Sequence, residues 1–501
     1  MTIAWEILEQ IRKLKKEEKH LSEPFNKKDA VNIALVYPSP YHIGMSSLGF
    51  QTIYRLFNQM DAVNCERAFL PDNPELYRKK KTKLFTFESE REVQKFDIVA
   101  FSVAYETEIL GMIENLELSA IPVFSSDRNS RYHPLVIAGG PLTFSNPLPV
   151  GPFVEVILLG EAEELISILV QHYKEANDRK ELLKTLAGIP GFYVPSVHGN
   201  NLPLIAKADH SLLPAFSQII TPNTELSNMF LIEPERGCSR GCTFCVMRRS
   251  TNNGMRLITP DNVLSKVPDF AEKVGLVGAA VSDHPKIVNI LEELIINRGK
   301  KIGISSLRAD RLTPRFVEML ALGGYKTLTV ASDGPSERVR QFMEKRILEK
   351  HLIYTADLVK EFKMKGLKLY MMIGIPGETD EDIDEMIDFS VRLSKITNVS
   401  MGISPFVAKK NTPLDKTNFD GIKNIDYKLK KINKALGRYI DLRSTSAKWA
   451  WVEYQLAQGD YDSGFAAMKA YQLGGNFAAW KGAFEQHNKV GNGRDCSLQI
   501  V

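Results

Sequence analysis

Residues 230–249 read FLIEPERGCSRGCTFCVMRR, and this stretch sets the interpretation of the whole chain. It opens with three apolar residues that predict a short buried strand. Three cysteines, Cys238, Cys242 and Cys245, follow with the spacing C-x3-C-x2-C, and the aromatic Phe244 directly precedes the last of them. Thiols gathered in this way after a strand predict a metal centre at the end of that strand.

The number of nearby thiols separates two kinds of metal centre. Soft thiolates suit zinc or an iron–sulfur cluster, but structural zinc takes four protein ligands. The other two of the five cysteines, Cys65 and Cys496, lie far away in the sequence. A cubane held by three cysteines leaves one iron open to an outside ligand, whereas a structural zinc knot would need a fourth partner. The clustered cysteines also argue for a reducing compartment and against a disulfide framework.

This spacing, with an aromatic residue before the third cysteine, resembles the radical SAM superfamily. The resemblance implies that Cys238, Cys242 and Cys245 hold a 4Fe–4S cluster and form the catalytic centre. The open iron of such a cluster binds the amino and carboxylate groups of S-adenosylmethionine (SAM). Reductive cleavage then gives a 5′-deoxyadenosyl radical, which implies an external electron donor such as ferredoxin or flavodoxin as a partner.

Length and composition limit the classes of protein to which the chain can belong. The chain has 501 residues, which is enough for two or three domains. Its 44% apolar and 25% charged residues are typical of a protein with a well-formed core, and its net charge of +4 is too small to argue for a nucleic-acid partner. No stretch has the apolar length needed to span a bilayer, and the N-terminus has no signal-peptide core. We therefore expect a cytoplasmic enzyme with no membrane partner.

The first part of the chain predicts a helix and then an α/β domain. Residues 1–30 contain an amphipathic helix, and from residue 31 nearly all-apolar segments alternate with helical ones. The predicted strands are 32–37, 66–70, 96–103, 134–138 and 154–159. Such strands are typical of a parallel sheet that is buried on both faces. The sequence therefore predicts a doubly wound, Rossmann-like domain over residues 31–180.

Glycines and a carboxylate follow several of these predicted strands. Ligands bind doubly wound sheets at the carboxyl ends of the strands, where Gly139, Gly140, Gly160 and Glu161 fall. Ordinary turn chemistry explains any one of these glycines. Together they favour a backbone that closely approaches a large or flat ligand, so all four residues are cofactor-binding candidates.

With the YPSPYHIGMSSLGFQ loop at residues 37–51, these residues resemble the N-terminal cobalamin-binding domain of many radical SAM enzymes. The resemblance implies that cobalamin binds here. The Asp-x-His-x-x-Gly signature of proteins that supply a histidine to the cobalt is absent, because no matching aspartate precedes His42. We therefore expect His42 to be a surface histidine and a bound cobalamin to lack a protein histidine as its lower ligand.

A second α/β series follows the first. Residues 181–228 are rich in turn residues and predict a connector, and residues 229–423 again alternate between strands and helices. The predicted strands are 229–234, 276–281, 302–306, 327–331, 369–374 and 399–404. Six βα repeats predict a partial (β/α)6 variant of the TIM barrel, and the active site of a barrel lies where its strands end.

Polar residues follow several of these barrel strands. By the radical SAM resemblance, Ser282 and Asp283 stand where many members carry Gly-Gly-Glu for the methionine amino group, although that triplet is missing here. Asp333 stands where an acidic residue meets the ribose, a role that suits a carboxylate acceptor. For each single residue a capping or solvated role is the alternative, as for Ser336 at the start of the next predicted helix.

The same resemblance suggests two further contacts with SAM. Ser306, Arg308 and Arg338 are candidates for its carboxylate, because arginine suits planar carboxylates. The run MIGIPGETDEDI resembles the segment that holds the adenine by backbone contacts. The candidates in that segment are Gly374, Pro376 and Gly377.

The last part of the chain, residues 424–501, predicts a helical region that is unusually aromatic. Trp449, Trp451 and Tyr454 are among its aromatic residues. We expect a small core that caps the barrel. Substrate docking is the alternative, because exposed aromatic side chains anchor interfaces.

Three functions are compatible with this organisation. The two domains in tandem favour a cobalamin-dependent radical SAM methyltransferase that acts on an unactivated carbon. The first alternative is a radical SAM enzyme of non-methylating type, such as a cyclase, a rearrangement enzyme or one resembling methylthiotransferases. The second is a non-catalytic iron–sulfur scaffold. The substrate stays open among protein, peptide, RNA and small molecule.

Overall fold

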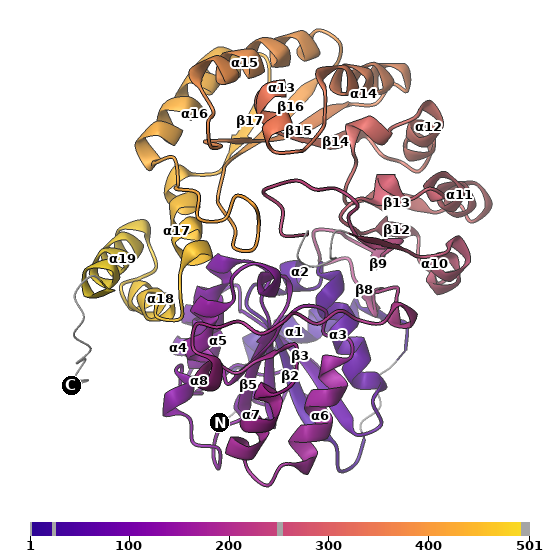
Figure 1. Ribbon diagram of the computed structural model, residues 1–501. Coiled ribbons are helices and arrows are strands. Elements are labelled where there is room, and N and C mark those ends of the chain that lie inside the picture. The colour runs from indigo at the N-terminus through magenta and orange to yellow at the C-terminus, as the bar shows by residue number, and fades with distance from the viewer. Residues whose placement is uncertain (1–2, 23–26, 248–253, 492–501) are drawn as a thin grey trace. The chain divides into compact units, whose positions relative to one another are not determined.

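The computed structural model describes residues 3–22, 27–247 and 254–491, and the chain forms two compact units (Figure 1). The first, the sheet unit, comprises Met1–Asp209, Thr221–Ser227 and Gln455–Val501. The second, the barrel unit, comprises His210–Ile220 and Asn228–Tyr454. In the part of the chain that the structure describes, no helix is both long and apolar enough to cross a membrane.

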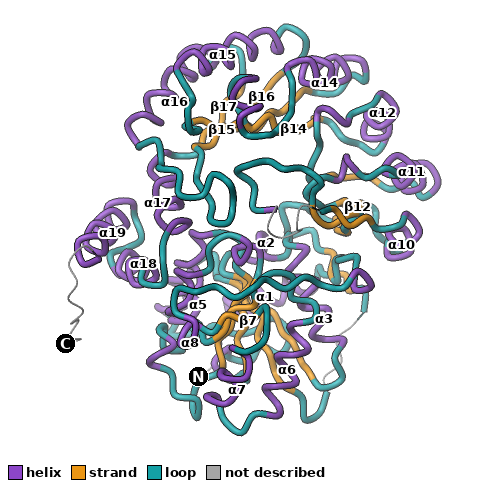
Figure 2. The backbone as a smooth tube through the Cα atoms, in the orientation of Figure 1, coloured by secondary structure: helices purple, strands orange, loops and turns teal. Residues whose placement is uncertain are grey.

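The sheet unit is built on a six-stranded sheet in the order β3-β2-β4-β5-β6-β7. The strands are β2 (Val31–Tyr37), β3 (Val63–Phe69), β4 (Ile98–Ser102), β5 (Leu135–Gly139), β6 (Val156–Leu158) and β7 (Phe192–Tyr193). The first five in sheet order are parallel, and β7 is antiparallel to β6. Because apolar residues fill these strands, both faces must be covered, and helices lie on both sides of the sheet (Figures 1 and 2). The predicted doubly wound domain is confirmed.

Helices of the sheet unit follow the predicted alternation. They include α1 (Trp5–Lys16), α3 (Leu48–Gln59), α5 (Ile109–Leu118), α6 (Leu165–Glu175) and α7 (Arg179–Ala187). The segment predicted as a connector is divided between the units, since α7 and β7 belong to the sheet unit and His210–Ile220 to the barrel unit. The early part of that segment is therefore the edge of the sheet.

The end of the chain also belongs to the sheet unit. Helix α18 (Ser463–Gln472) packs on α5 and on the 3-10 segment Leu148–Phe153, and α19 (Phe477–Gly491) packs on α18. The approach is close, because a Cβ on Gly464 would lie 2.5 Å from the carbonyl oxygen of Pro149. The prediction that the whole aromatic tail caps the barrel is therefore wrong from residue 455 onward: small residues on α18 let it pack on the sheet unit instead.

The barrel unit contains two parallel sheets in the orders β13-β12-β9 and β14-β15-β16-β17. A parallel bridge between Leu307 and Val330 joins them. The strands are β9 (Met229–Ile232), β12 (Lys273–Leu276), β13 (Lys301–Ile304), β14 (Thr327–Asp333), β15 (Gly366–Ile373), β16 (Val399–Pro405) and β17 (Asp441–Ser444). Together they form the predicted partial barrel, and β17 adds a further parallel strand to it.

Helices cover the outside of this barrel (Figure 1). They are α10 (Pro260–Lys266), α11 (Ile287–Glu292), α12 (Pro314–Leu322), α14 (Glu349–Glu361), α15 (Asp380–Ser394) and α16 (Ile422–Leu436). The short helix α13 (Glu337–Phe342) follows β14, and α17 (Ala447–Gln458) follows β17. Ser336 caps α13, because its hydroxyl accepts a hydrogen bond from the amide of Val339. The capping role considered for Ser336 from the sequence is confirmed.

One predicted strand of the barrel is misplaced. Residues 276–281 were expected to be extended, but β12 ends at Leu276 and the chain then turns into a 3-10 segment, Val281–Asp283. The neighbouring strands explain the early end, because β9 stops at Ile232 and β13 at Ile304, the residues that pair with Leu276. Beyond Leu276 no strand remains beside the chain in this sheet, so the apolar run continues as a loop.

Candidate active site

The three-cysteine loop begins at a short antiparallel ladder at the mouth of the barrel unit. Strand β10 (Glu235–Gly237) pairs with β11 (Met255–Leu257), and the amide of Cys238 donates to the carbonyl oxygen of Gly254 at 3.1 Å. Gly237 has φ +104°, a conformation that favours glycine. The ladder and this glycine therefore direct the chain from β9 into the loop; Arg248 and Arg249, at the end of the quoted stretch, lie outside the described residues.

Contacts to two other segments of the barrel unit hold this loop in place. The amide of Thr243 donates to the carbonyl oxygen of Met343 at 3.0 Å, and the amide of Leu414 donates to that of Thr243 at 3.2 Å. Phe244 packs on a hydrophobic cluster, which we call the mouth cluster. Its buried members are Val339, Met343, Ile375, Phe406 and Ala408, and Phe244, Met372, Leu414 and Tyr454 pack against them. The loop is thus anchored beyond the ends of β15 and β16.

The thiols of the loop influence one another electrostatically. Burial raises the pKa values of Cys242 and Cys245, and the charge of Cys238 raises both further. Lys345 acts in the opposite direction on both thiols. Among the described residues no three His, Cys, Asp or Glu side chains are gathered closely enough to hold a metal ion, so the three thiols share one loop without converging on a point.

The donor set of this loop fits a cluster with three protein ligands. Cys65, a fourth described cysteine, is buried in the sheet unit, and Cys496 lies outside the described residues. Burial and the neighbouring thiols oppose ionisation of Cys242 and Cys245 and raise their pKa values. A bound iron–sulfur cluster would remove that penalty, since coordination deprotonates a thiol.

An ionic network around Asp283 joins the cysteine loop to two neighbouring strand ends. Arg240, from the loop, lies 3.6 Å from Asp283 and 3.2 Å from Asp310. Arg308, beyond β13, lies 3.3 Å from Asp283 and 2.8 Å from Asp310. Burial acts to raise the pKa of Asp310, but the hydrogen bond from Arg308 and the charges of Arg308 and Arg240 together outweigh it, and the pKa is lowered. Asp283 is 3% exposed, and neither of its oxygens accepts a hydrogen bond among the described residues.

Glu235 is a buried carboxyl that sequence analysis did not single out. Its side chain lies in β10, where Oε1 accepts a hydrogen bond from the amide of Ala280 at 2.8 Å and Oε2 has no hydrogen-bond partner among the described residues. Burial raises its pKa to about 7, and the charges of Glu233 and Asp283 contribute in the same direction. No sequence pattern could reveal this, because the partner amide lies in the loop that was expected to be a strand.

Asp333 lies close to the cysteine loop, at the end of β14. Its φ of +63° is unusual for a residue other than glycine, and the register of β14 against β15 shifts at this point. Its carboxylate pairs with Lys345, and its charge acts on the thiol of Cys242. Backbone strain of this kind costs on the order of 1–3 kcal/mol and is concentrated at functional sites.

Ser282 and Ser306 join the rim loops to each other. The hydroxyl of Ser282 accepts a hydrogen bond from the amide of Arg308 at 3.0 Å. The hydroxyl of Ser306 donates to the carbonyl oxygen of Gly278 at 3.0 Å and accepts from the amide of Val281 at 3.2 Å. These serines therefore shape the mouth, and their contact with SAM stays a prediction.

The GIPGE segment after β15 is held by its own carboxylate and by Arg338. Gly374 and Gly377 have φ values of +77° and +75°. Glu378 accepts hydrogen bonds from the amides of Gly374 at 2.9 Å and Ile375 at 3.4 Å. Arg338 donates to the carbonyl oxygen of Gly377 at 2.9 Å and pairs with Asp382 on α15. Arg338 thus braces the segment that carries the adenine candidates, and its expected contact with the SAM carboxylate stays a prediction.

A buried lysine fixes the other side of the same segment. Lys428, on α16, lies 2.7 Å from Glu378 and 2.8 Å from Asp420, and its side chain is 5% exposed. Burial acts to lower its pKa, but the two carboxylates outweigh that effect and the pKa is raised. Sequence analysis missed Lys428, because its partner Glu378 lies fifty residues earlier in the chain, and it therefore also missed Asp420, which pairs with Lys428.

In the sheet unit the glycine candidates are explained by the protein's own backbone. Gly140 has φ +107°, and a Cβ there would lie 2.6 Å from the carbonyl oxygen of Val103. Gly160 has φ +96°, and a Cβ there would lie 2.3 Å from the carbonyl oxygen of Ala206. Neighbouring loops therefore already require these two glycines, and their contact with a cofactor stays a prediction.

The other two candidates of the sheet unit are Gly139 and Glu161, and their contact with a cofactor stays a prediction. Glu161 accepts a hydrogen bond from the amide of Ala208 at 2.8 Å. A Cβ on Gly139 would make ordinary contacts at 3.7 Å with Leu158. A contact within the sheet unit therefore accounts for Glu161, whereas packing does not require a glycine at position 139.

The carboxyl ends of β2 and β4 form the switch point of this sheet, where ligands of doubly wound folds bind. Ser39 donates to Glu108 at 3.0 Å, and the amide of Ala104 donates to the same carboxylate at 2.6 Å. Tyr105 is 47% exposed at this edge, and His42 on the short helix α2 (Tyr41–Gly44) is also exposed, as predicted. These two loops therefore offer the accessible side chains of the edge.

Fold and site together define a class of protein: a partial barrel with a three-thiol loop at its mouth, preceded by a doubly wound sheet. Two family models match the chain, "Radical SAM proteins, N-terminal" over residues 49–195 and "Radical SAM superfamily" over residues 232–390. The chain belongs to the radical SAM superfamily and is a radical SAM enzyme. Membership implies a 4Fe–4S cluster and SAM as cofactors.

Relatives and solved structures agree with this assignment over most of the chain. An uncharacterized protein of Methanocaldococcus jannaschii is 28% identical over 417 residues, which cover 81% of this chain and 83% of that protein. The radical SAM methyltransferase TsrM from Kitasatospora setae, solved with tryptophan and a SAM analogue, has a TM-score of 0.54 at 15% identity, covering 79% of this chain and 76% of its own. OxsB, a cobalamin-dependent SAM radical enzyme solved with aqua-cobalamin, also has a TM-score of 0.54 at 15% identity, covering 82% of this chain and 58% of its own. The sheet unit therefore has the fold of the cobalamin-binding type.

Proposed function

We propose that this protein is a cobalamin-dependent radical SAM methyltransferase that methylates an unactivated carbon of its substrate. The observation that supports this proposal is the extent of the fold likeness. It covers 79% of the chain with TsrM and 82% with OxsB, so it includes the sheet unit as well as the barrel unit. A radical SAM enzyme that needed only its barrel would have no use for a doubly wound sheet of this type.

Different residues of the barrel mouth would bind the cluster and the separate groups of SAM. Cys238, Cys242 and Cys245 would hold the cluster, and the backbone of the GIPGE segment would hold the adenine. When bound, the cluster and SAM supply one-electron cleavage of the sulfonium, with electrons from an external donor such as ferredoxin or flavodoxin. Asp283 has carboxylate oxygens that lack hydrogen-bond donors among the described residues, and so it suits the amino group of SAM.

The sheet unit would hold cobalamin at the switch point between β2 and β4. When bound, cobalamin supplies a carrier for the methyl group. The exposed Tyr105 and the loop that follows β2 would face the corrin ring. Because no aspartate matches His42 in a cobalamin-binding signature, His42 would not ligate the cobalt.

The test is anaerobic reconstitution with iron, sulfide and hydroxocobalamin, followed by SAM labelled in its methyl group and a reductant. We expect bound corrinoid in the visible spectrum, deoxyadenosine, and labelled methyl groups in the product. A Cys238→Ala, Cys242→Ala, Cys245→Ala triple variant is the control for the cluster. Deoxyadenosine without corrinoid or methyl transfer would instead support a non-methylating radical SAM enzyme, and the absence of both would support a scaffold.

A further inference from the structure

A pocket of about 610 Å³ lies in the barrel unit, between the chain that leads into α16 and the helix α17. Its lining residues are Asn418, Phe419, Asp420, Gly421, Ile422, Lys423, Asn424, Trp451 and Tyr454. Ligand pockets of proteins usually measure about 300–1,000 Å³, so this one is large enough for a ring system with a substituent. None of its residues belongs to the cysteine loop or to the GIPGE segment.

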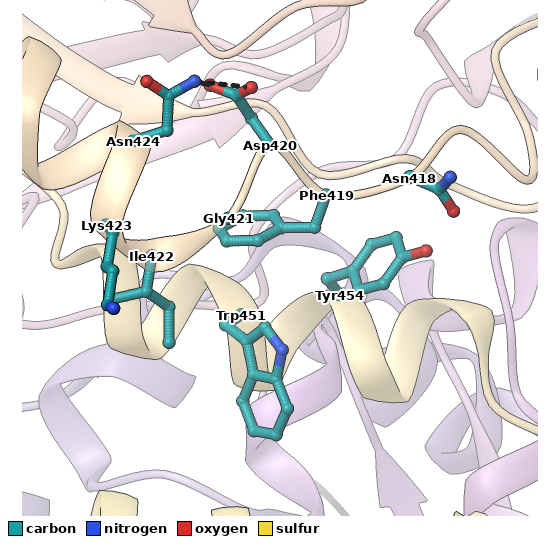
Figure 3. Close-up of a pocket in the computed structure, with 9 residues that line it drawn as sticks. All are labelled: Asn418, Phe419, Asp420, Gly421, Ile422, Lys423, Asn424, Trp451 and Tyr454. Carbon is teal, nitrogen blue, oxygen red and sulfur yellow. Dashed lines mark hydrogen bonds between the residues drawn. The ribbon is translucent and has the colours of Figure 1, made fainter.

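Three aromatic rings form the apolar part of this pocket. Phe419 comes from the loop before α16, and Trp451 and Tyr454 lie three residues apart on α17 and so share one face of that helix. The rings of Phe419 and Tyr454 are 5.8 Å apart and tilted by 35°. Figure 3 shows Phe419, Trp451 and Tyr454 grouped around one space, with Trp451 below Phe419. Ring faces arranged in this way bind flat aromatic groups by stacking.

The polar residues of the pocket have two different roles. Asp420 is used within the protein, because it accepts two hydrogen bonds of 2.9 Å from Asn424 and pairs with the buried Lys428. In Figure 3 the Asp420–Asn424 pair points away from Trp451. Lys423 is exposed and forms no ion pair among the described residues. The pocket thus presents one available cation at its side, on the first turn of α16, next to Ile422 (Figure 3).

The position of the pocket connects it to the reaction centre. Tyr454 belongs to the mouth cluster, and Phe244, which precedes Cys245, packs on the same cluster. Asp420 is tied through Lys428 to Glu378, whose carboxylate shapes the GIPGE segment. The pocket and the cysteine loop therefore border the same hydrophobic cluster.

We infer that this pocket binds the substrate through a planar heteroaromatic ring that carries an anionic group within reach of Lys423. The rings supply stacking and Lys423 supplies the charge complement, so a nucleotide and an aromatic amino acid share the required chemistry. The inference deepens the proposed function by naming a substrate class. It rests on the radical SAM assignment and does not depend on methyl transfer.

The test measures binding by calorimetry to the reconstituted holoenzyme, with SAM saturating its own site and with no turnover. The anionic probes are adenosine 5′-monophosphate and N-acetyl-L-tryptophan, and their neutral counterparts are adenosine and N-acetyl-L-tryptophanamide. We expect one anionic probe to bind, with its neutral counterpart about threefold weaker. The probe that binds identifies the source of the ring. N-acetyl-L-leucine, an anion without an aromatic ring, should not bind.

Two matched pairs of variants locate the binding. Trp451→Leu should weaken the bound probe about tenfold, because one stacking partner is lost. Trp449→Leu changes a residue of the same type about 200° further round the same helix and outside the pocket lining, and should leave the affinity unchanged. Lys423→Gln should abolish the advantage of the anionic probe, whereas the exposed Lys430→Gln on the same helix should preserve it.

Three results would overturn the inference: no anionic probe binding below about 5 mM, equal effects of Trp451→Leu and Trp449→Leu, or N-acetyl-L-leucine binding as well as the aromatic probes. Each is independent of methyl transfer, because cobalamin is not needed for the binding assay. Failure of methyl transfer with intact probe binding would therefore contradict the proposed function and leave this inference standing.

Discussion

At the mouth of the barrel unit, oppositely charged side chains that follow different strands form ion pairs with one another. At the carboxyl edge of the sheet unit, by contrast, backbone segments pack closely against one another. In the barrel unit Asp283 is buried, and within the described part of the chain neither of its oxygens accepts a hydrogen bond, while Asp333 is held at φ +63°. In the sheet unit Gly140 and Gly160 are needed because Val103 and Ala206 pass within 2.6 and 2.3 Å of where a Cβ would stand.

The difference between these two regions teaches which signals point to a ligand. Asp283 is paired with arginines but accepts no hydrogen bond among the described residues, so its oxygens are able to take a donor from a ligand. A glycine at a crowded position has a cheaper explanation, because the chain's own packing already requires it. The side chains at the barrel mouth therefore indicate a binding site, whereas packing within the sheet unit is enough to explain Gly140 and Gly160.

The largest expected effect belongs to the cysteine loop. Cys242→Ala should lower the rate of deoxyadenosine formation from SAM by on the order of a thousandfold or more, because the cofactors that this loop holds carry out the cleavage. Iron content and the product, measured after anaerobic reconstitution, check this. Cys65→Ala, in the sheet unit, should retain both. Equal loss in the two variants would remove the distinction between the units.

The buried lysine of the barrel unit comes next. Lys428→Met should destabilise the protein by about 3 kcal/mol, because Glu378 and Asp420 would stay buried without their shared cation. It should also weaken SAM binding, since Glu378 shapes the GIPGE segment. Chemical denaturation and SAM titration test both effects. Lys430→Met, on the exposed face of the same helix, should change neither, and a matching loss there would argue that the helix itself is at fault.

The sheet unit offers a test that could reverse the comparison. Gly160→Ala should destabilise the protein by about 3 kcal/mol, because the new methyl group meets Ala206 and the φ of +96° disfavours alanine. Gly199→Ala, also at positive φ but with no atom within 4 Å of its Cβ, should cost about 1 kcal/mol. Urea unfolding measures both. If Gly160→Ala folded normally and lost only corrinoid binding, this glycine would mark a ligand after all.

The smallest expected effect is a pH dependence at the barrel mouth. The pKa of Glu235 is raised to about 7 in the folded protein from an ordinary value of 4.5, so the stability that its protonated form contributes is lost as the pH rises from 4.5 through 7. Glu235→Gln stays neutral and should gain stability over the parent by on the order of 2 kcal/mol between pH 5 and pH 8. Melting temperatures of the two proteins across this range check it. A constant difference would contradict the raised pKa.

Local chemistry could be predicted from the sequence, and distant pairing could not. The apolar strand β2 and the C-x3-C-x2-C loop can each be recognised from a few consecutive residues. The strand β17 is missed because its residues DLRS are largely exposed and give no apolar signal. The sequence predicts a strand where the loop after β12 lies, because the residues there are apolar. In the structure β9 and β13 end level with Leu276, so the residues that follow it lack a neighbouring strand in this sheet.

The site followed the same division. Cys238, Asp283 and Asp333 were identified by residue type and position at strand ends, and the structure places them around one mouth. Lys428 and Glu235 were not, because each acquires its role from a partner that only folding brings near. A buried ion pair across many residues leaves no periodicity to detect.

The packing of α18 against α5 has a consequence for how the chain is made. The sheet unit is interrupted by the whole barrel unit, and the surface that α18 covers stays bare until residues 463–472 have left the ribosome. At about 5–20 residues per second, that interval lasts roughly 10–50 seconds after residue 209 is added. During translation the barrel unit can fold before the sheet unit is complete. Until then the surface of α5 that α18 covers is exposed on the nascent chain, and a chaperone bound there would protect it.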